Sequence, residues 1–317
     1  MRLGDGQTSV DASSHRDDDD DDDSDDDSVA SDPDQITAHE ARLEQRYAHA
    51  LALKQDKPRD ELLNVAFKLV DNLIGQYKLN RAEEILQHIA QDCALTDIHR
   101  DAADAAAPLD NAAAERVRYH LKHVQALAFC RWKQYRFREA LELFLEQERM
   151  IGASANLCEN IGHTYSSIGE LDKAAEYFER SLAILETNNV EGNKGGVLMG
   201  LGLVKDRSSK TDEALPLLRQ ALEFYQRRTA ASPKTDSSIV AKAHMAVGKA
   251  LEKLKRLEEA DDQVDSALRI FTRTVGDSSP LTANALGTLG RIRVARGMKP
   301  EGAELSRRAL ELEVGKD

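Results

Sequence analysis

The stretch ENIGHTYSSIGELDKAAEYFERSLAILE, residues 159–186, has the spacing of two amphipathic helices joined by a tight turn. Each helix contributes one small residue, where the two helices can cross closely, and one aromatic residue that fills the space beside the crossing. A glycine between the two patterns permits the turn. The stretch therefore predicts an antiparallel helix pair. Its packing residues are Gly162 and Tyr165 in the first helix, Gly169 in the turn, and Ala174 and Phe178 in the second helix.

The pattern of the second helix recurs along the chain. A small crossing residue stands in similar surroundings at Ala140, Ala174, Ala214, Ala260 and Gly302, with spacings of 34, 40, 46 and 42 residues. A weaker unit is centred on Ala82. Two helical turns after the crossing residue, on the same face, a second signal recurs as Ser181-Leu182, Ala221-Leu222, Ala267-Leu268 and Ala309-Leu310. Repeats of this length are typical of solenoids built from stacked helix pairs.

We therefore expect an all-α solenoid, a right-handed superhelix of about six antiparallel helix pairs, with no sheet. The sequence divides into a disordered acidic tail over residues 1–34, an N-terminal helix and a degenerate helical repeat over 35–92, an Ala- and Asp-rich loop over 93–114, and the repeat array over 115–317. The alanines of the loop could instead form a short extra helix.

The net charge of -13 belongs almost entirely to the tail. Residues 1–34 hold fourteen Asp against Arg2 and Arg16, a net charge of -12, so the rest of the chain carries about -1. Residues 17–27, DDDDDDDSDDD, offer no apolar side chain to bury and should not fold alone. Ser24 and Ser31 each precede an Asp by three residues, which predicts phosphorylation by an acid-directed kinase.

We predict the cellular location and the lack of catalytic activity mainly from sequence motifs that the chain does not contain. No apolar run is long enough for a membrane helix, and the acidic N-terminus does not resemble a secretory or mitochondrial leader, so we expect a cytoplasmic protein. Cys93, Cys130 and Cys158 are widely spaced, which indicates reduced, buried residues. No nucleophile has a sequence-local acid–base partner, and we expect neither an enzyme nor a cofactor.

The repeats from about Leu62 to Glu313 resemble the tetratricopeptide-repeat (TPR) family. The unit with Gly162, Tyr165, Ala174 and Phe178 matches best, and the units at Ala82 and Gly302 are degenerate. ALRIFTRTVGDSSPLTANALGTLGRI, residues 267–292, is similar to the repeats of about 42 residues in kinesin light chains. A long heptad coiled coil is missing, because the only candidate segment is Ile36 to Lys54, so the chain departs from a kinesin light chain itself.

This resemblance implies that a peptide or another protein binds in a concave groove lined by the first helix of each pair. The lysines, arginines and amides on this wall suit an acidic linear motif. The alternative is that they form ordinary solvated helix faces. The predicted groove residues are Lys122, Phe129, Trp132, Asn156, Asn160, His163, Arg207, Lys242, Lys249, Lys253 and Arg291.

Other ligands fit less well. The clamp for chaperone C-terminal tails requires Lys and Asn where this chain has Gln125 and Phe129, and Lys and Arg where it has Gly196 and Gly200. Asn160 alone matches, so we expect no binding of chaperone tails. The Gly248-Lys249 pair lacks the rest of a phosphate loop. His120 and His123, or His88, Cys93 and His99, do not have the spacing of a metal site, and we interpret the first two as partly exposed surface residues. Arg131, Lys133, Arg136 and Arg138, beside Trp132 and Tyr135, make only a short basic cluster, so we expect no nucleic acid.

Two classes of function remain. One is an adaptor that holds an acidic peptide in the groove. The other is a structural subunit that packs laterally in a larger assembly, such as a ciliary or microtubule-motor complex. Charge changes at Lys249 and Lys253 should affect the first and not the second.

Overall fold

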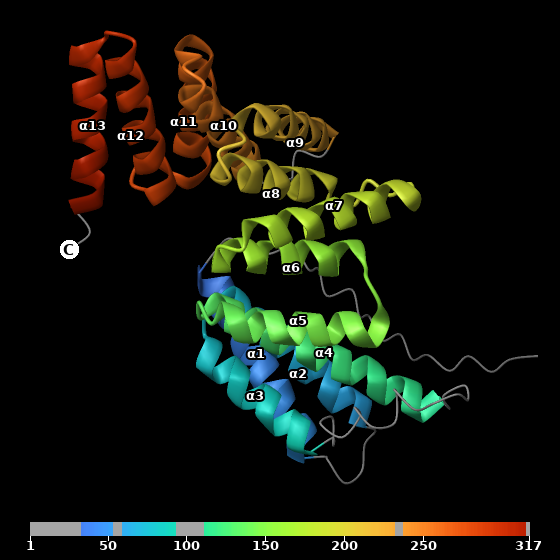
Figure 1. The fold of residues 1–317 in the computed structure, drawn as a ribbon. Coiled ribbons are helices and arrows are strands. Elements are labelled where there is room, and N and C mark those ends of the chain that lie inside the picture. The colour runs from blue at the N-terminus through green and yellow to red at the C-terminus, as the bar shows by residue number, and fades with distance from the viewer. Residues whose placement is uncertain (1–32, 53–58, 93–110, 232–236, 315–317) are drawn as a thin grey trace, which may run out of the picture.

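The computed structural model describes residues 33–52, 59–92, 111–231 and 237–314, and within these ranges it contains thirteen α-helices and no strand (Figure 1). The helices are α1 (Pro33–Ala52), α2 (Arg59–Gly75), α3 (Leu79–Asp92), α4 (Asn111–Lys133), α5 (Phe137–Ile151), α6 (Ala155–Ile168), α7 (Leu171–Thr187), α8 (Lys194–Arg207), α9 (Thr211–Ala231), α10 (Ser237–Lys253), α11 (Leu257–Val275), α12 (Pro280–Ala295) and α13 (Lys299–Val314).

The order of the elements is one N-terminal helix followed by six helix pairs, as the repeat pattern predicts. Each pair from α2–α3 to α12–α13 packs against the next, and the contacts between helices distant in the chain are few. The all-α solenoid is therefore confirmed. Such a stack is quasi-one-dimensional, since each pair is stabilised mainly by its two neighbours.

The small crossing residues lie in the second helix of each pair and are buried. Ala82, Ala140, Ala174, Ala214 and Ala260 have no exposed surface. In the last pair, a Cβ on Gly302 would lie 2.6 Å from the backbone oxygen of Gly290, so α12 and α13 approach too closely for any side chain there. The turn within each pair uses left-handed backbone, with Gly169 at φ 98° between α6 and α7.

Three apolar clusters form a continuous core along the stack. The first joins α1 to α4, the second runs from α4 to α8, and the third from α8 to α12. Phe178 of α7 shows how neighbouring pairs interlock. Its ring packs between Gly162 of α6 and Gly200 of α8, where an added Cβ would lie 3.1 Å and 2.6 Å from it.

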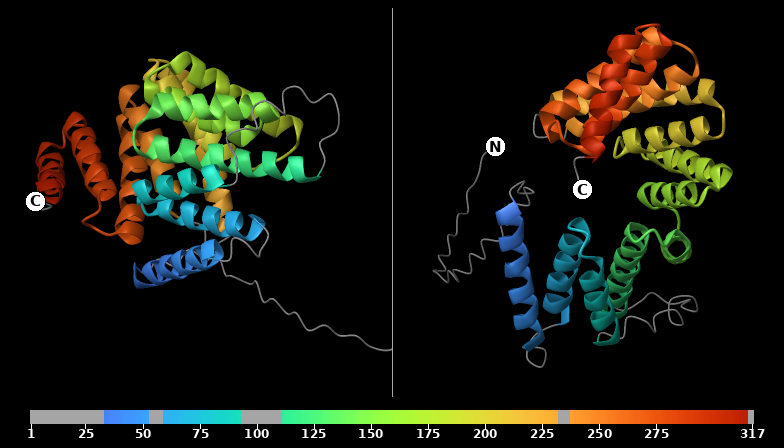
Figure 2. Two further views of the ribbon diagram at one scale, coloured as in Figure 1. Left: turned by 90° about the horizontal axis from the view of Figure 1, so that it is seen from below. Right: turned by 90° about the vertical axis from the view of Figure 1, so that its left-hand side faces the viewer.

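The stack curves toward the first helices of the pairs. α6, α8, α10 and α12 contact one another in sequence, whereas the second helices α7, α9, α11 and α13 share no comparable contacts in the described ranges. Figure 1 shows the bend, with α10–α13 lying to one side of α1–α5, and the right-hand view of Figure 2 shows a C-shaped outline. The first helices therefore form the inner wall of the curve.

Two boundaries differ from the sequence prediction. α1 begins at Pro33, two residues inside the predicted tail. α4 begins at Asn111, so residues 111–114 are helical and not part of the predicted loop. The alanines of this segment favour helix once α4 has a core to pack on. Ser24, Ser31, Cys93, His99 and the acidic run 17–27 lie outside the described residues.

Candidate functional site

All the predicted groove residues lie on first helices of pairs, which together we call the inner wall (α4, α6, α8, α10 and α12). Lys122, Phe129 and Trp132 come from α4, and Asn156, Asn160 and His163 from α6. Arg207 ends α8. Lys242, Lys249 and Lys253 are exposed on α10, and Arg291 is exposed on α12.

Most cations of the inner wall contact the neighbouring first helix. Lys253 of α10 pairs with Asp206 of α8, with 2.6 Å between Nζ and Oδ2. Arg291 of α12 donates two hydrogen bonds, of 2.7 and 2.8 Å, to the carboxylate of Glu252 on α10. The sequence analysis did not identify Asp206 or Glu252. The wall is thus less basic than predicted, because these carboxylates neutralise part of its charge.

Arg207 of α8 makes a similar contact with the preceding first helix, α6. Its Nη1 donates to the backbone oxygen of Ser166 at 2.8 Å and to the Ser166 hydroxyl at 2.7 Å, which joins α8 to α6. Such exposed contacts are each worth about 0–1 kcal/mol, so they can open when a ligand offers better partners. The inner wall is therefore a polar surface whose cations are positioned but not deeply buried.

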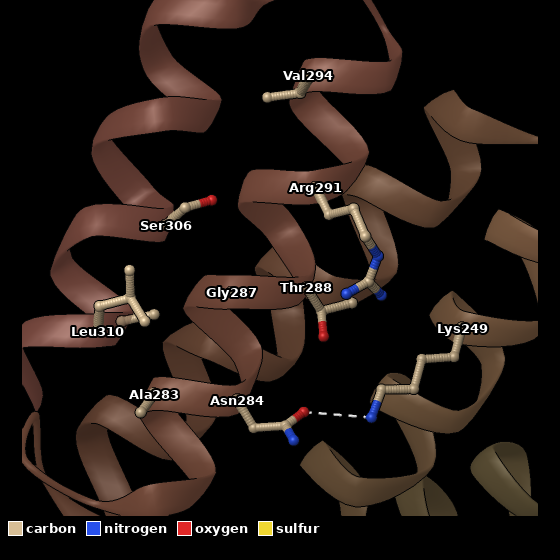
Figure 3. Close-up of a pocket in the computed structure, with 10 residues that line it drawn as sticks. Lys249, Ala283, Asn284, Gly287, Thr288, Arg291, Val294, Ser306 and Leu310 are labelled. Carbon is tan, nitrogen blue, oxygen red and sulfur yellow. Dashed lines mark hydrogen bonds between the residues drawn. The ribbon is translucent and has the colours of Figure 1, made fainter. Parts of the chain in front are cut away.

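A pocket of about 620 Å³ lies on the inner wall at its C-terminal end (Figure 3). Lys249 reaches across from α10 and donates to Asn284 Oδ1 of α12 at 3.2 Å, and Arg291 lies beside them. The opposite side is apolar, with Val294 of α12 and Leu310 of α13, which are 42% and 60% exposed. The pocket therefore offers two cations, an amide and an apolar surface in one place.

Electrostatics distinguish Lys249 from the other cations. Burial, and then the nearby positive charge of Arg291, lowers the pKa of Lys249, and Glu252 only partly compensates. Glu252 is already engaged by Arg291. Two cations therefore lie near one carboxylate that is paired with Arg291, and an incoming anion would relieve the repulsion between them.

Amides and a carboxylate meet on the N-terminal side of the wall. Glu159 of α6 is buried and accepts a 2.7 Å hydrogen bond from Nδ2 of Asn193, and its Oε1 lies 3.7 Å from Nε2 of His163. A Cβ on Gly196 would lie 2.7 Å from Glu159 Oε1, so the glycine leaves room for this contact. Asn156 is exposed, and Asn160 is half-buried. This part of the wall is polar but not basic.

The aromatic residues predicted for the groove are partly occupied in packing. Phe129 is half-buried, with its ring centroid 5.6 Å from that of Phe144. Trp132 is half-buried against Phe137, at 6.0 Å between centroids. Lys122 is exposed, but its Nζ lies 5.9 Å from the ring centroid of Phe67 on α2. These three residues do not join the pocket on α10–α13.

The histidines and cysteines depart in part from expectation. His120 is buried, contrary to the prediction of a surface residue, because α4 turns it toward Glu146 of α5, at 3.6 Å between Nε2 and Oε1. His88 accepts or donates a 2.7 Å hydrogen bond with Tyr47. Cys130 and Cys158 are buried and free. The part of the chain that the structure describes holds no cluster of three His, Cys, Asp or Glu side chains placed to bind a metal.

Two other features considered in the sequence analysis, a membrane-spanning helix and a phosphate loop, can be compared with the described residues. No described helix has the length and apolarity needed to cross a membrane. The glycine of Gly248-Lys249 packs against α11, where a Cβ would lie 2.5 Å from Val264 Cγ2. A close helix contact accounts for this glycine without any bound phosphate.

Comparison with known proteins identifies repeats in the second half of the chain. Residues 153–227 and 239–312 each match the family model of the tetratricopeptide repeat. No curated protein matches the chain. Solved structures share its fold at low identity. BtubC (BKLC) from P. vanneervenii is 20% identical with a TM-score of 0.56, and the match covers 78% of this chain and 91% of BtubC.

Two other solved structures extend the comparison. The apo form of RapI, 15% identical with a TM-score of 0.62, matches over 90% of this chain and 73% of its own. A kinesin light chain with nearly identical TPR-like repeats from Podosopora anserina is 18% identical with a TM-score of 0.50, over 62% of this chain and 96% of its own. These likenesses show the fold, and the family model shows the repeats. The second half of the chain, over residues 153–227 and 239–312, consists of tetratricopeptide repeats.

Proposed function

We propose that the protein is a non-catalytic, cytoplasmic interaction scaffold that binds an acidic segment of a partner protein on its inner wall. The supporting observation is the pocket on α10, α12 and α13, where Lys249 and Arg291 lie together beside an exposed apolar surface and the nearby carboxylate of Glu252 pairs with Arg291. An acidic residue would bond the cations, and a neighbouring apolar side chain would cover Val294 and Leu310. Lys253 and Arg207 already bond to Asp206 and Ser166, so we expect them to contribute less to binding than Lys249 and Arg291.

The ligand class can be tested with defined peptides. A short fluorescein-labelled peptide of Glu and Leu and a matching peptide of Lys and Leu would be titrated with the full chain, with fluorescence anisotropy as the readout. We expect only the acidic peptide to bind. Lys249→Gln should weaken its binding about fivefold to tenfold, the effect of losing one charge-assisted hydrogen bond.

Lys299→Gln is the matched control, because Lys299 is exposed on α13 outside the pocket. Equal binding of both peptides, or equal affinities of the Lys249 and Lys299 variants, would contradict the proposal. Binding of neither peptide would favour the alternative of a structural subunit that packs laterally in a larger assembly.

A further inference from the structure

A second surface, apart from the pocket on α10, α12 and α13, gathers aromatic residues at the edge formed by the helix turns, where α4 of the inner wall ends. Tyr77 in the turn between α2 and α3 is 67% exposed, and Tyr135 in the turn between α4 and α5 is 82% exposed. Both have left-handed backbone, with φ of 58° and 62°. A bulky aromatic residue is uncommon in this conformation, and the equivalent turns of the other pairs use Gly169, Ser209, Lys255 and Gly297.

These tyrosines belong to one connected patch. Lys133 Nζ lies 4.2 Å from the ring centroid of Tyr77, which joins the two turns. The ring of Phe137 lies edge-on to both Tyr135, at 5.9 Å, and Trp132, at 6.0 Å. Arg138 is exposed on the same turn, and a pocket of about 420 Å³ lies between this turn and Ser167 and Ile168 of α6. We call Tyr77, Trp132, Lys133, Tyr135, Phe137 and Arg138 the turn-edge patch.

The patch carries cations that are available to a ligand. Arg131 and Arg136 are engaged by Glu83 and Glu139. Lys133 instead lies over an aromatic ring, and Arg138 is exposed beside the pocket. Arg138 has no ion-pair partner among the described residues. An aromatic face that holds a cation, next to this guanidinium, fits an anionic chain better than an apolar one.

The N-terminal end of α1 lies at this same edge. Lys78, next to Tyr77, binds Glu40 of α1 at 2.5 Å, and Arg81 of α3 binds Glu44 at 3.0 Å. α1 and α3 both pack on α2 and run in the same direction, so the start of α1 at Pro33 extends past the turn by about 10 Å, seven residues at 1.5 Å each. In Figure 1 the turns that follow α4 and α6 lie at the left edge of the lower stack, and the right-hand view of Figure 2 shows α1 at one end of the row of helices, beside α2 and α3.

The acidic run 17–27 is attached at this point. Five residues separate Asp27 from Pro33. They span at most about 20 Å, so the last aspartates of the run can reach the Tyr77 turn from where α1 begins, and the earlier aspartates can extend further along the patch. Ten aspartates in eleven positions supply the opposite charge. A segment tethered this closely has an effective concentration in about the millimolar range, so weak contacts can be substantially populated.

We propose that the turn-edge patch is a docking surface for the acidic segment 17–27 of the same chain. Lys133 and Arg138 contact its carboxylates, and the segment covers Tyr77, Tyr135 and the pocket beside them. The contact shields the exposed aromatic edge until a stronger anionic partner displaces it. This role is separate from peptide binding in the pocket on α10, α12 and α13.

The sole tryptophan of the chain, Trp132, reports on the patch directly. Its indole N–H gives one cross-peak in a ¹H–¹⁵N NMR spectrum of the full chain. Raising the salt concentration from about 0.01 M to about 1 M shortens the screening length from about 30 Å to about 3 Å, which should release the segment and move the peak. The movement should vanish when the ten aspartates of residues 17–27 are replaced by asparagine.

Two charge-reversed variants complete the test. Lys133→Glu with Arg138→Glu should abolish the salt-dependent movement, whereas Lys299→Glu with Arg308→Glu, the same charge change on α13, should keep it. The movement should also be unchanged over a tenfold range of protein concentration. An equal movement in the asparagine variant would overturn the proposal, and a concentration-dependent one would assign the contact to a second copy and overturn docking within one chain.

Discussion

At the scale of single residues, glycines on the inner helices decide how closely neighbouring pairs approach. Gly200 of α8 faces Phe178, and its missing side chain leaves room for the ring, which is fully buried. Gly287 of α12 differs, since a Cβ there would meet only the Cβ of Ala309, at an ordinary 3.7 Å. The same Gly→Ala change therefore has opposite consequences at the two positions.

Gly200→Ala should lower the free energy of unfolding by about 1–3 kcal/mol, because the new methyl group must displace the packed ring of Phe178. Gly287→Ala should raise it by up to about 1 kcal/mol, since alanine restricts the unfolded chain and favours helix. Urea denaturation of the two variants gives both values. If both variants changed the free energy of unfolding in the same direction, the close contact at Gly200 would be contradicted.

His123 of α4 gives the stability a dependence on pH. Its Nδ1 is buried without a hydrogen-bond partner in the described part of the chain. Burial, and then the neighbouring His120, lowers the pKa of His123 to about 4. The ordinary value, about 6.5, applies in the unfolded chain. Between these two values the unfolded state binds a proton that the folded state does not, so the free energy of unfolding falls as the pH falls.

We expect His123→Asn to reduce this pH dependence. Between about pH 7.5 and about pH 4.5, the variant should lose less stability than the original chain, by on the order of 2 kcal/mol. Chemical denaturation at a series of pH values measures the difference. Parallel stability profiles for the two proteins would show that His123 does not resist protonation in the folded state.

At the scale of helices, a buried carboxylate joins α11 to α12. Asp261 is 7% exposed, its Oδ1 lies 3.1 Å from Nε of Arg293, and its Oδ2 lies 3.2 Å from Nη1 of Arg296. Both arginines are themselves largely covered. Removing the carboxylate would leave two partly buried cations without their shared partner, which costs more than the loss of an exposed ion pair.

Asp261→Ala should therefore lower the free energy of unfolding by about 1–3 kcal/mol. Asp262→Ala, one residue further along α11 and exposed, is the matched control and should have little effect. Thermal unfolding of both variants in the same buffer provides the comparison. An equal loss of stability in the two would attribute the effect to helix propensity and not to the junction.

The sequence predicts helices better than it predicts the contacts between them. Ala174 and Phe178 could be placed in register because the helix period and a small residue at each crossing are local signals. The partners of Lys253 and Arg291 are Asp206 and Glu252, 47 and 39 residues away, and their pairing depends on the rotation between successive helix pairs. No local pattern encodes that rotation, so the inner wall was predicted to be more basic than it is.

The same limit explains His120 and the turn-edge patch. The spacing of His120 and His123 marks one helix face but does not show that α5 covers it. Tyr77 and Tyr135 lie 58 residues apart in the sequence, and only the stacking of α2–α3 against α4–α5 brings Lys133 of one unit over Tyr77 of the other. The left-handed residue occupies the same position in the turn of each pair, so aligning the repeats with one another would show that Tyr77 and Tyr135 are equivalent.

At the scale of the whole molecule, each described helix packs mainly on the helices next to it in the chain, and the stack does not close into a ring. α7 contacts α6 and α8, and contacts between helices further apart are few. Ala174 lies at the centre of the cluster that runs from α4 to α8, without exposed surface. In a stack of this kind, damage to one pair is transmitted through successive interfaces and weakens with distance.

Ala174→Arg should lower the free energy of unfolding by several kcal/mol, because a long charged side chain cannot enter the crossing of α6 and α7 without separating the helices. The loss should be local. In native-state hydrogen exchange, we expect faster exchange of the amides of α6, α7 and α8, while those of α2, α3 and α13 keep their rates.

The control for this change is Glu176→Arg, two residues further on the exposed face of the same helix, which should leave all rates unchanged. A far-UV spectrum confirms that both variants keep their helices. If exchange in the Ala174 variant accelerated equally from α2 to α13, the thirteen helices would unfold as one cooperative unit, and the nearest-neighbour description of the stack would be wrong.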